Sequence, residues 1–364
     1  MSLCLLFCVS AIPANAEEVS TSAQAYVLYC PQNSEIILSK NKDIRLPIAS
    51  TTKVMTALLT LEEAQRDNRV VEFSEEMTAE GSSMYLLVGE QVMLYDLAVG
   101  MLMQSGNDAA NAAAIAIDGS LQAFSDRMNI RASELGMKNT HFVTPSGLDD
   151  EEHYSTAYDM ALLLSSAMEN ESFREITKNT AMTVDFVYPD DKHVTYQNHN
   201  KLLKLYEPCI GGKTGYTEKA GRCLVSCAEK DGVRLICVSL GDPDDWDDHI
   251  ALFEEGFLRV ESVTLGETGE TFSVPLVGAA EESVSLTYDP PTAVVSDDTE
   301  IERKIILPDF IYAPVETGEI LGKIIFFHDG KELARADLTA VREISCENKK
   351  QTFIDYIKEL FHWH

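Results

Sequence analysis

The sequence predicts an α+β fold, in which an N-terminal hairpin and later strands enclose a helical lobe, followed by a small all-β sandwich and a short amphipathic helix. Tyr26–Leu38 contains two strand-like runs around the turn-forming residues 31–34. Residues 84–168 have a mostly helical pattern and are rich in alanine. Strand-like runs return after Gly211. Helical segments that lie between strands of one domain indicate an α+β domain with a helical lobe.

The remaining elements of this first domain follow from local pattern. A helix is expected from about Ser50 to Arg66, because apolar residues recur there at helical spacing after Pro47. Arg222–Ala228 and Val233–Leu240 are two apolar runs around a Glu-Lys-Asp-Gly turn, which predicts a hairpin. A closing helix is expected over Ala251–Val260. The first domain should therefore span residues 17–261.

The composition changes near Ser262. Short strand-like runs separated by Gly, Pro and Asp predict a β-sandwich over residues 262–345. The last stretch, residues 346–364, places four apolar side chains on one helical face: Phe353, Ile357, Leu360 and Phe361. It is too short to cross a bilayer, and its pattern suits a helix lying at a membrane surface. A helix packed on the β-sandwich explains the same pattern equally well.

The N-terminus indicates an exported protein. Leu3–Ile12 is an apolar run too short to span a bilayer, and Ala14-Asn15-Ala16 has the small-x-small pattern that signal peptidase cleaves. The usual positive charge before such a run is missing, and a buried N-terminal element is the alternative. We expect residues 1–16 to be a signal peptide and the mature chain to act outside the cytoplasm, at the outer face of the membrane or in the cell wall.

Charge and cysteine content exclude several classes of function. The 364-residue chain has a formal net charge of −30, which opposes binding to nucleic-acid phosphates. Its eight cysteines form no C-x-x-C pattern and have no histidine partners at zinc-site spacing, so neither a metal nor a cofactor is expected. Four cysteines between 209 and 237 lie in strand-like sequence, where they are expected as small buried side chains.

The first chemical motif is Ser50-Thr51-Thr52-Lys53. A serine hydroxyl needs a nearby base to become a nucleophile, and residues i and i+3 share one face of a helix. Burial and the helix N-terminus both favour a neutral, basic Lys53. The same pattern occurs at Ser39 and Lys42, but that copy lies in a polar segment where nothing would bury the lysine. Ser50 is therefore the predicted nucleophile.

Two further motifs supply polar groups. Ser105-Gly106-Asn107 precedes an alanine-rich helix, where an ordinary helix cap is the competing interpretation. Lys213-Thr214-Gly215 follows two glycines, which would let a substrate backbone approach while the cation and hydroxyl meet a carboxylate. A phosphate-binding loop is disfavoured, because the Walker pattern requires glycine where Glu207 stands.

Taken in order, the strings IASTTKVMTALL, SGNDAANAAA and GGKTGYTEKAGRCLVS resemble the D-alanyl-D-alanine carboxypeptidases, the low-molecular-mass penicillin-binding proteins. The likeness covers about Ala23 to Val260. It implies a catalytic domain of the serine β-lactamase/DD-peptidase type, and the β-sandwich and amphipathic tail match the usual architecture of that family. The implied substrate is a peptidoglycan stem peptide, and β-lactam antibiotics are the implied covalent inhibitors.

The resemblance also implies residue roles. Ser50 would attack the carbonyl between two terminal D-alanines, Lys53 would be the general base, and Ser105 would pass a proton to the leaving amine. The implied substrate-binding residues are Asn107, Lys213, Thr214 and Gly215. The backbone N–H groups of Ser50 and Tyr216 would form the oxyanion hole.

The chain departs from the family pattern at one position, and three alternatives remain. His199 stands where the family often has an arginine that helps to hold the terminal carboxylate, and we interpret it as a surface histidine. A class A β-lactamase normally has an E-x-x-L-N string, which is absent between Asn107 and Lys213. A non-catalytic penicillin-sensing or wall-binding module is the second alternative. An endopeptidase, which breaks a similar D-configured bond with the same groups, is the third.

Overall fold

The structure, a computed structural model, describes residues 19–296 and 299–346. The chain divides into two compact units, with the boundary between Glu261 and Ser262. The expected signal peptide at 1–16 and nearly all of the expected tail at 346–364 lie outside the described residues.

The first unit is built on a five-stranded antiparallel sheet with the order β2-β1-β9-β8-β7. The strands are β1 (Ala25–Cys30), β2 (Glu35–Lys40), β7 (Cys209–Thr217), β8 (Gly221–Lys230) and β9 (Val233–Leu240). Hairpins join β1 to β2 and β8 to β9, as their sequences predict. The order leaves β7 at one edge of the sheet, with its outer side free of a sheet partner.

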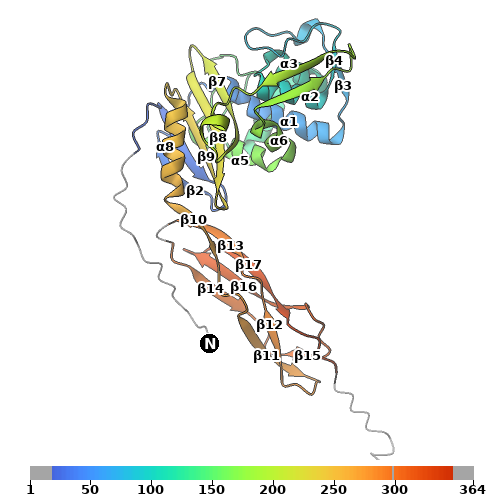
Figure 1. Cartoon of the computed structure of the whole chain (residues 1–364), viewed down its shortest axis with the longest axis vertical. Coiled ribbons are helices and arrows are strands. Elements are labelled where there is room, and N and C mark those ends of the chain that lie inside the picture. The colour runs from blue at the N-terminus through green and yellow to red at the C-terminus, as the bar shows by residue number, and fades with distance from the viewer. Residues whose placement is uncertain (1–18, 297–298, 347–364) are drawn as a thin grey trace, which may run out of the picture. The chain divides into compact units, whose positions relative to one another are not determined.

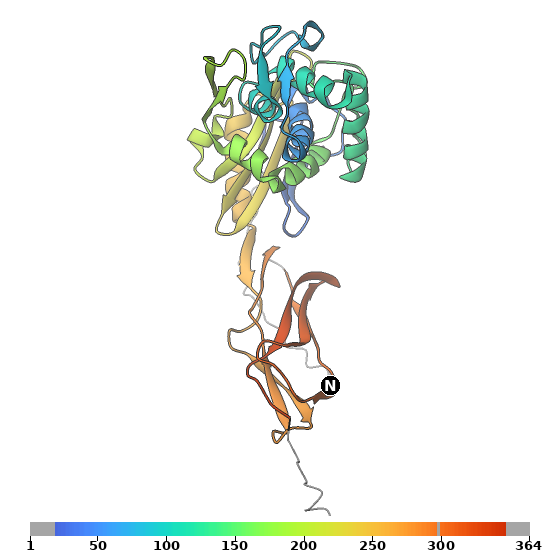
Figure 2. The same cartoon turned by 90° about the vertical axis from the view of Figure 1, so that its right-hand side faces the viewer.

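Helices cover both faces of this sheet (Figures 1 and 2). Helix α8 (Asp245–Phe257) packs on one face, against β8 and β9. The other face carries the helical lobe: α1 (Lys53–Arg66), α2 (Leu94–Met103), α3 (Asn107–Asp118), α4 (Leu121–Glu134), α5 (Ala157–Glu169) and α6 (Glu171–Lys178). Successive side chains of each strand point to opposite faces of the sheet, so that Val27 of β1 joins the core under the lobe while Leu28 faces α8.

Short elements complete the first unit, and the sequence patterns did not predict several of them. Two small hairpins lie at the edge of the helical lobe: β3 (Val70–Glu72) with β4 (Gln91–Met93), and β5 (Ala181–Asp185) with β6 (His193–Gln197). Two 3₁₀ turns and a single helical turn complete the unit: η1 (Ala49–Thr52), η2 (Glu75–Met77) and α7 (Leu202–Leu205).

The second unit is a β-sandwich. Its main sheet has six strands in the order β14-β16-β17-β12-β11-β15, and β10 pairs with β13 in a second sheet. The strands are β10 (Val260–Thr264), β11 (Thr271–Val277), β12 (Ser283–Thr287), β13 (Thr292–Ser296), β14 (Glu302–Ile306), β15 (Ile311–Tyr312), β16 (Ile320–His328) and β17 (Lys331–Ala340). Alternating residues such as Val284 and Leu286 of β12 are fully buried in its core.

Two element boundaries differ from the sequence predictions. The closing helix begins at Asp245 rather than Ala251, because Asp245, Asp247 and Asp248 stabilise its first turn, where acidic side chains interact well with the helix dipole. It ends at Phe257, since β10 starts at Val260. The helix predicted from Ser50 begins as the 3₁₀ turn η1 and becomes α-helical only at Lys53.

The described cysteines behave as predicted. Cys209, Cys223, Cys227 and Cys237 are buried free thiols of β7, β8 and β9, and burial raises the pKa of Cys209 to about 11. Within the ranges that the structure describes, no helix is long and apolar enough to cross a bilayer.

Helix α8 lies unusually close to the sheet at Gly256, and a larger side chain there should loosen the unit. A Cβ on Gly256 would lie 2.4 Å from Cδ2 of Leu28 and 2.8 Å from Cδ1 of Leu235. We expect Gly256→Val to lower the free energy of unfolding of this unit by about 1–3 kcal/mol, although valine has the higher helix propensity. Urea titration followed by Trp246 fluorescence, in a Trp363→Phe background, measures the change.

The matched control is Ala251→Val, at an exposed position of the same helix. This variant should lower the free energy of unfolding by no more than about 0.5 kcal/mol, which is the difference in helix propensity between alanine and valine. Equal destabilisation by the two variants would show that the close approach at Gly256 does not matter.

Candidate active site

Ser50 and Lys53 lie where η1 joins α1. In a 3₁₀ turn the side chains at i and i+3 eclipse each other, and the Lys53 Nζ lies 3.0 Å from the Ser50 Oγ. Ala49 enters the turn with φ +47°, a conformation that side-chain-bearing residues seldom adopt. Gly147 packs so closely on this turn that a Cβ there would lie 2.1 Å from the Ala49 carbonyl oxygen. The turn is therefore held from outside in an unfavourable backbone conformation.

Lys53 is fully buried and makes three hydrogen-bonding contacts. Its Nζ lies 3.0 Å from the Ser50 Oγ, 2.6 Å from Oδ1 of Asn107 and 2.6 Å from the Ser146 carbonyl oxygen. Desolvation holds the pKa of Lys53 well below its usual value, with Lys213 adding to the shift and Asp108 opposing it.

These contacts orient the amine when it is neutral. A neutral lysine has two N–H groups and one lone pair, and the two carbonyl oxygens on Asn107 and Ser146 can only accept. When both N–H groups donate to them, the lone pair remains for the hydroxyl proton of Ser50. The geometry thus suits proton transfer from Ser50 to Lys53.

Ser105 lies between the end of α2 and the start of α3. Its φ of +61° is strained for a serine, and it places the hydroxyl 3.0 Å from the Nζ of Lys213. No side-chain cap bond forms at the start of α3. The helix-cap interpretation of this motif is therefore not supported.

Asn107, predicted to bind substrate, directs its side-chain amide into the protein. Its Oδ1 accepts a 2.6 Å hydrogen bond from Lys53, and its Nδ2 donates a 2.7 Å bond to the Glu80 carbonyl oxygen. The side chain is almost completely buried. In this structure Asn107 therefore connects the first two motifs, and a direct substrate contact stays a prediction.

Lys213 is a buried amine on the edge strand β7. Its Nζ donates to the Ser105 Oγ at 3.0 Å and to the Thr214 carbonyl oxygen at 2.8 Å. Desolvation lowers the pKa of Lys213 to about 7. Near neutral pH this group can therefore gain or lose a proton at little cost.

Gly215 brings the β7 backbone into close contact with the turn that carries Ser50. A Cβ on Gly215 would lie 3.0 Å from the Ile48 carbonyl oxygen and 3.1 Å from the Ser50 backbone nitrogen. The adjacent Tyr216 has a side chain that is 66% exposed. The backbone of β7 thus runs beside the backbone of Ser50, and the predicted oxyanion hole takes one N–H group from each of these two segments.

A cleft of about 480 Å³ contains most of these groups. Its lining residues are Ser50, Ser82, Ser105, His199, Thr214, Gly215, Tyr216, Arg222, Asp245 and Trp246. His199 is solvent-exposed, as predicted, but it lines the cleft, and desolvation followed by the charge of Lys213 lowers its pKa.

Four lining residues had no sequence prediction: Ser82, Arg222, Asp245 and Trp246. Arg222 begins a predicted strand, but only the pairing of β7 with β8, which places it directly opposite Tyr216, shows that it belongs to the cleft. Asp245 and Trp246 escaped notice because the start of α8 was placed too late.

Asp108, next to the second motif, positions the loop that contributes Ser82. Its Oδ1 accepts from the Met84 backbone N–H at 2.8 Å, and its Oδ2 accepts from the Ser83 hydroxyl at 2.7 Å and from the Leu86 N–H at 3.2 Å. The carboxylate is buried. These three donors from one loop fix its conformation, so Asp108 supports the cleft wall without entering it.

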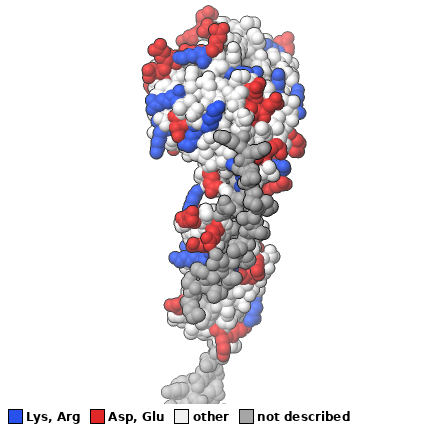
Figure 3. Space-filling view, turned by 90° about the vertical axis from the view of Figure 1, so that its left-hand side faces the viewer, with Lys and Arg blue, Asp and Glu red and all other residues white. Residues whose placement is uncertain are grey.

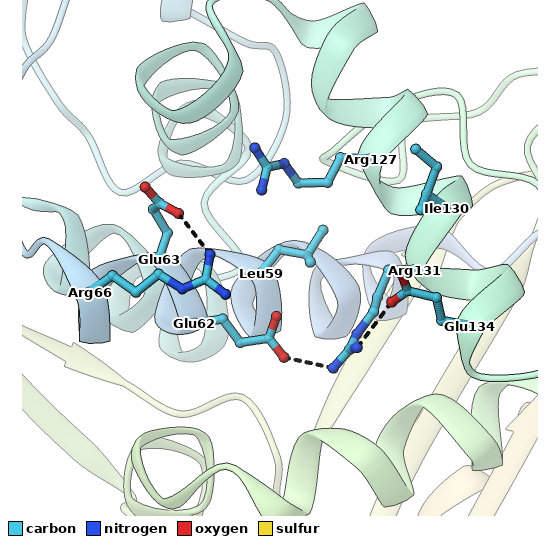
Figure 4. A pocket seen from close by; sticks show the side chains of 8 residues that line it. All are labelled: Leu59, Glu62, Glu63, Arg66, Arg127, Ile130, Arg131 and Glu134. Carbon is cyan, nitrogen blue, oxygen red and sulfur yellow. Dashed lines mark hydrogen bonds and ion pairs between the residues drawn. The ribbon is translucent and has the colours of Figure 1, made fainter.

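Other candidate sites lack the required chemistry. In the second S-x-x-K copy Ser39 is exposed, and the half-buried Lys42 pairs with Asp43 rather than with Ser39. A 290 Å³ pocket between α1 and α4 contains charged groups already engaged in ion pairs, such as Glu62 with Arg131, and offers no nucleophile (Figure 4). Among the described residues, no cluster of three or more His, Cys, Asp or Glu could hold a metal ion.

The net charge of −30 is spread over side chains of both signs. On the face drawn in Figure 3, acidic and basic side chains lie interspersed, without one continuous basic area.

Comparison with known families decides the class of this site. The family described as D-alanyl-D-alanine carboxypeptidase matches residues 12–244, which is more than half of the chain. The chain belongs to the D-alanyl-D-alanine carboxypeptidase family. It is accordingly a serine hydrolase, and residues 261–345 match the C-terminal domain of penicillin-binding protein 5.

Individual members of the family are similar over nearly the whole chain. The D-alanyl-D-alanine carboxypeptidase DacF of Bacillus subtilis is 33% identical, over 94% of this chain and 90% of the relative. DacA of Escherichia coli strain K12 is 30% identical, over 99% of this chain and 95% of its own length. The crystal structure of penicillin-binding protein 5 from Haemophilus influenzae matches 92% of this chain and all of that chain, with 28% identity and a TM-score of 0.66.

Proposed function

We propose that this enzyme removes the terminal D-alanine from peptidoglycan stem peptides through an acyl-enzyme on Ser50. The contact between the Ser50 hydroxyl and the buried Lys53 amine, at 3.0 Å, carries the proposal. A lysine whose pKa lies well below its usual value can act as a base at ordinary pH. The names of its family and relatives supply the substrate class.

Acylation begins with transfer of the Ser50 proton to Lys53. The Oγ then bonds to the carbonyl carbon between the two terminal D-alanines, and the carbonyl electrons move to oxygen. The backbone N–H groups of Ser50 and Tyr216 stabilise this oxyanion, which the closeness of Gly215 to Ser50 supports. The tetrahedral intermediate therefore forms against the edge of β7.

Collapse of this intermediate breaks the C–N bond and needs a proton on the leaving amine. Ser105 supplies it, and the proton that Lys53 took from Ser50 returns to the Ser105 oxygen by way of Lys213, whose Nζ lies 3.0 Å from the Ser105 Oγ, so that both lysines regain their starting charge. Because Lys213 has a pKa near 7, it can exchange protons with this network. Water then attacks the acyl carbonyl with Lys53 as base, which releases the shortened peptide and restores Ser50.

β-Lactams act as covalent inhibitors of this site. They acylate Ser50 as a substrate does, but the leaving nitrogen stays attached through the opened ring. Of the residues that line the cleft, only Asp245 has a carboxylate, and Arg222 neutralises it. With no free glutamate beside the acyl group, hydrolysis should be slow, which distinguishes this enzyme from a class A β-lactamase.

The central experiment measures D-alanine released from a muramyl pentapeptide. We expect the wild-type enzyme to release one D-alanine per peptide and Ser50→Ala to lose at least about 10³-fold in kcat/KM, because the nucleophile is gone. The matched control is Ser39→Ala in the exposed second S-x-x-K copy, which should retain full activity.

Intact-mass measurements with benzylpenicillin separate the alternatives in the same samples. A Ser50 adduct that persists for minutes, together with D-alanine release, supports the carboxypeptidase. An adduct that disappears within seconds identifies a β-lactamase. A persistent adduct without any D-alanine release identifies a non-catalytic sensor.

The pH dependence of acylation should report on Lys53. Protonated Lys53 cannot accept the Ser50 proton, so the acylation rate falls as pH decreases through the lowered pKa of this group. Lys53→Arg keeps the charge but stays protonated, and it should reduce acylation by about 10²–10⁴-fold at every pH. Stopped-flow measurements with a fluorescent penicillin give these rates.

Lys42→Arg is the control for that series, and it should keep both the rate and the profile of the wild type. If Lys53→Arg acylated at wild-type rates with the same acid limb, another group would be the base.

We also propose that the mature enzyme is exported and attached to the membrane surface by residues 346–364. The apolar run followed by Ala14-Asn15-Ala16 supports export, and the apolar face with Phe353, Ile357 and Leu360 supports attachment. A role in peptidoglycan maturation and cell shape follows from the substrate.

Vesicle co-sedimentation tests the attachment. The full chain should pellet with lipid vesicles, and a chain truncated after Glu347 should stay in the supernatant, because it lacks the apolar face. The double variant Phe353→Ser, Leu360→Ser is the matched control for length and should resemble the truncated chain. Equal sedimentation of all three proteins would contradict the proposal.

A further inference from the structure

The proposed substrate ends in a free carboxylate, and the cleft must hold that charge. The scissile bond lies one residue from the chain end, so the carboxylate enters the cleft together with the reacting carbonyl. Burying an anion without a fixed cation is costly. Three side chains in or beside the cleft could in principle supply the positive charge: Lys213, His199 and Arg222.

Lys213 and His199 are poorly suited to this task. Lys213 is buried, donates two hydrogen bonds within the protein, and has a pKa near 7, so it is not a permanent charge. His199 has a pKa below its ordinary value, because it is partly desolvated and faces Lys213, and it is mostly neutral at neutral pH. The guanidinium of Arg222 offers a planar fork of N–H donors that matches the two oxygens of a carboxylate.

The position of Arg222 on the sheet directs it toward the substrate. Arg222 of β8 pairs directly with Tyr216 of β7, so both side chains lie on the same face of the sheet. Thr214, two residues before Tyr216, is on that face also and is the diagonal neighbour of Arg222. Such neighbours lie within reach of a long side chain. A carboxylate beside the Thr214 hydroxyl would therefore be within reach of the guanidinium.

Two residues of α8 hold the guanidinium in place. The Nη2 of Arg222 donates to Oδ1 of Asp245, whose own side chain is only 3% exposed. The Arg222 Cζ lies 5.4 Å from the centre of the Trp246 ring, at cation–π distance. The Arg222 Nε is buried and has no hydrogen-bond partner in the protein. The Arg222 side chain as a whole is 40% exposed and lines the cleft, so its outer nitrogens, rather than the Nε, are open to a ligand there.

We propose that Arg222, held by Asp245 and Trp246, binds the terminal carboxylate of the substrate together with the Thr214 hydroxyl. The inference rests on the proposed function, and it assigns carboxylate recognition to β8 rather than to the position of His199. Arg222 thereby selects peptides with a free C-terminus over those in which the chain continues.

The test compares two substrates that differ only in this charge. One is a stem-peptide analogue ending in D-Ala-D-Ala, and the other is the same peptide with its C-terminal carboxylate converted to an amide. We expect Arg222→Gln to reduce kcat/KM for the free acid on the order of 100-fold, because a charged hydrogen-bonded contact is lost. For the amide the change should be less than about threefold.

A second pair of ligands makes the same comparison without peptide hydrolysis. Benzylpenicillin has a free carboxylate and its methyl ester does not. Acylation of Ser50 by the acid should slow in the variant, while acylation by the ester should not. This arm remains informative if the wild-type enzyme releases no D-alanine, a result that would overturn the proposed function but not the role of Arg222.

Three further variants separate binding from structural support. Arg222→Gln, Asp245→Asn removes both charges of the pair, leaves no lone buried carboxylate, and should show the same discrimination between acid and amide. Arg222→Lys keeps the charge but not the planar donor set. Its kcat/KM should fall about tenfold for the acid and stay unchanged for the amide. Arg234→Gln removes an ion-paired arginine of β9 outside the cleft, and it should leave kcat/KM unchanged for both substrates.

Equal losses on the acid and amide substrates in Arg222→Gln and in the double variant would overturn the inference, since they indicate structural support. Unchanged activity on the acid would overturn it equally. A preference for the acid that the wild type shows, that Arg222→Gln and the double variant lose and that Arg222→Lys retains in part would establish it.

Discussion

The site depends on one constraint: two lysine side chains, Lys53 and Lys213, are buried beside the two serines of the cleft. An unpaired ammonium in a protein interior is expensive, and two adjacent ones repel each other as well. Lys53 and Lys213 come from a helix and an edge strand that are far apart in sequence, so only the packing of the helical lobe against β7 brings them together. The depressed pKa values of both are a consequence of this packing. Their chemistry thus follows from the fold itself.

The same packing explains the strained backbone at both serines. Ala49, before Ser50, and Ser105 itself have positive φ angles. Such residues persist only where their surroundings leave no alternative, and here Gly147 packs on the first turn while Lys213 bonds the Ser105 hydroxyl. Asp108 adds a third restraint through its loop. The hydroxyls are consequently in place before any substrate arrives, so little ordering entropy is lost on binding.

The sequence predicted those features that depend on local pattern. The hairpin of β1 and β2, the hairpin of β8 and β9, and the α+β class are confirmed, because alternation and turn residues determine them. The S-x-x-K pair could be placed because i and i+3 meet within one turn. The connection of Asn107 to Lys53 depends on tertiary packing, and no pattern in the sequence indicates it. The start of α8 was missed since its Asp-rich first turn resembles a loop in composition.

The Arg222–Asp245 pair has a consequence for turnover as well as for binding. A carboxylate contact made equally in the ground state and the transition state lowers KM without raising kcat. The released D-alanine carries the same carboxylate, so a very strong anchor would also retain the product. Asp245 holds one nitrogen of the guanidinium while the side chain stays 40% exposed, which limits the strength of the anchor while keeping its direction. An ion-paired arginine therefore suits an enzyme that must recognise a chain end and then release it.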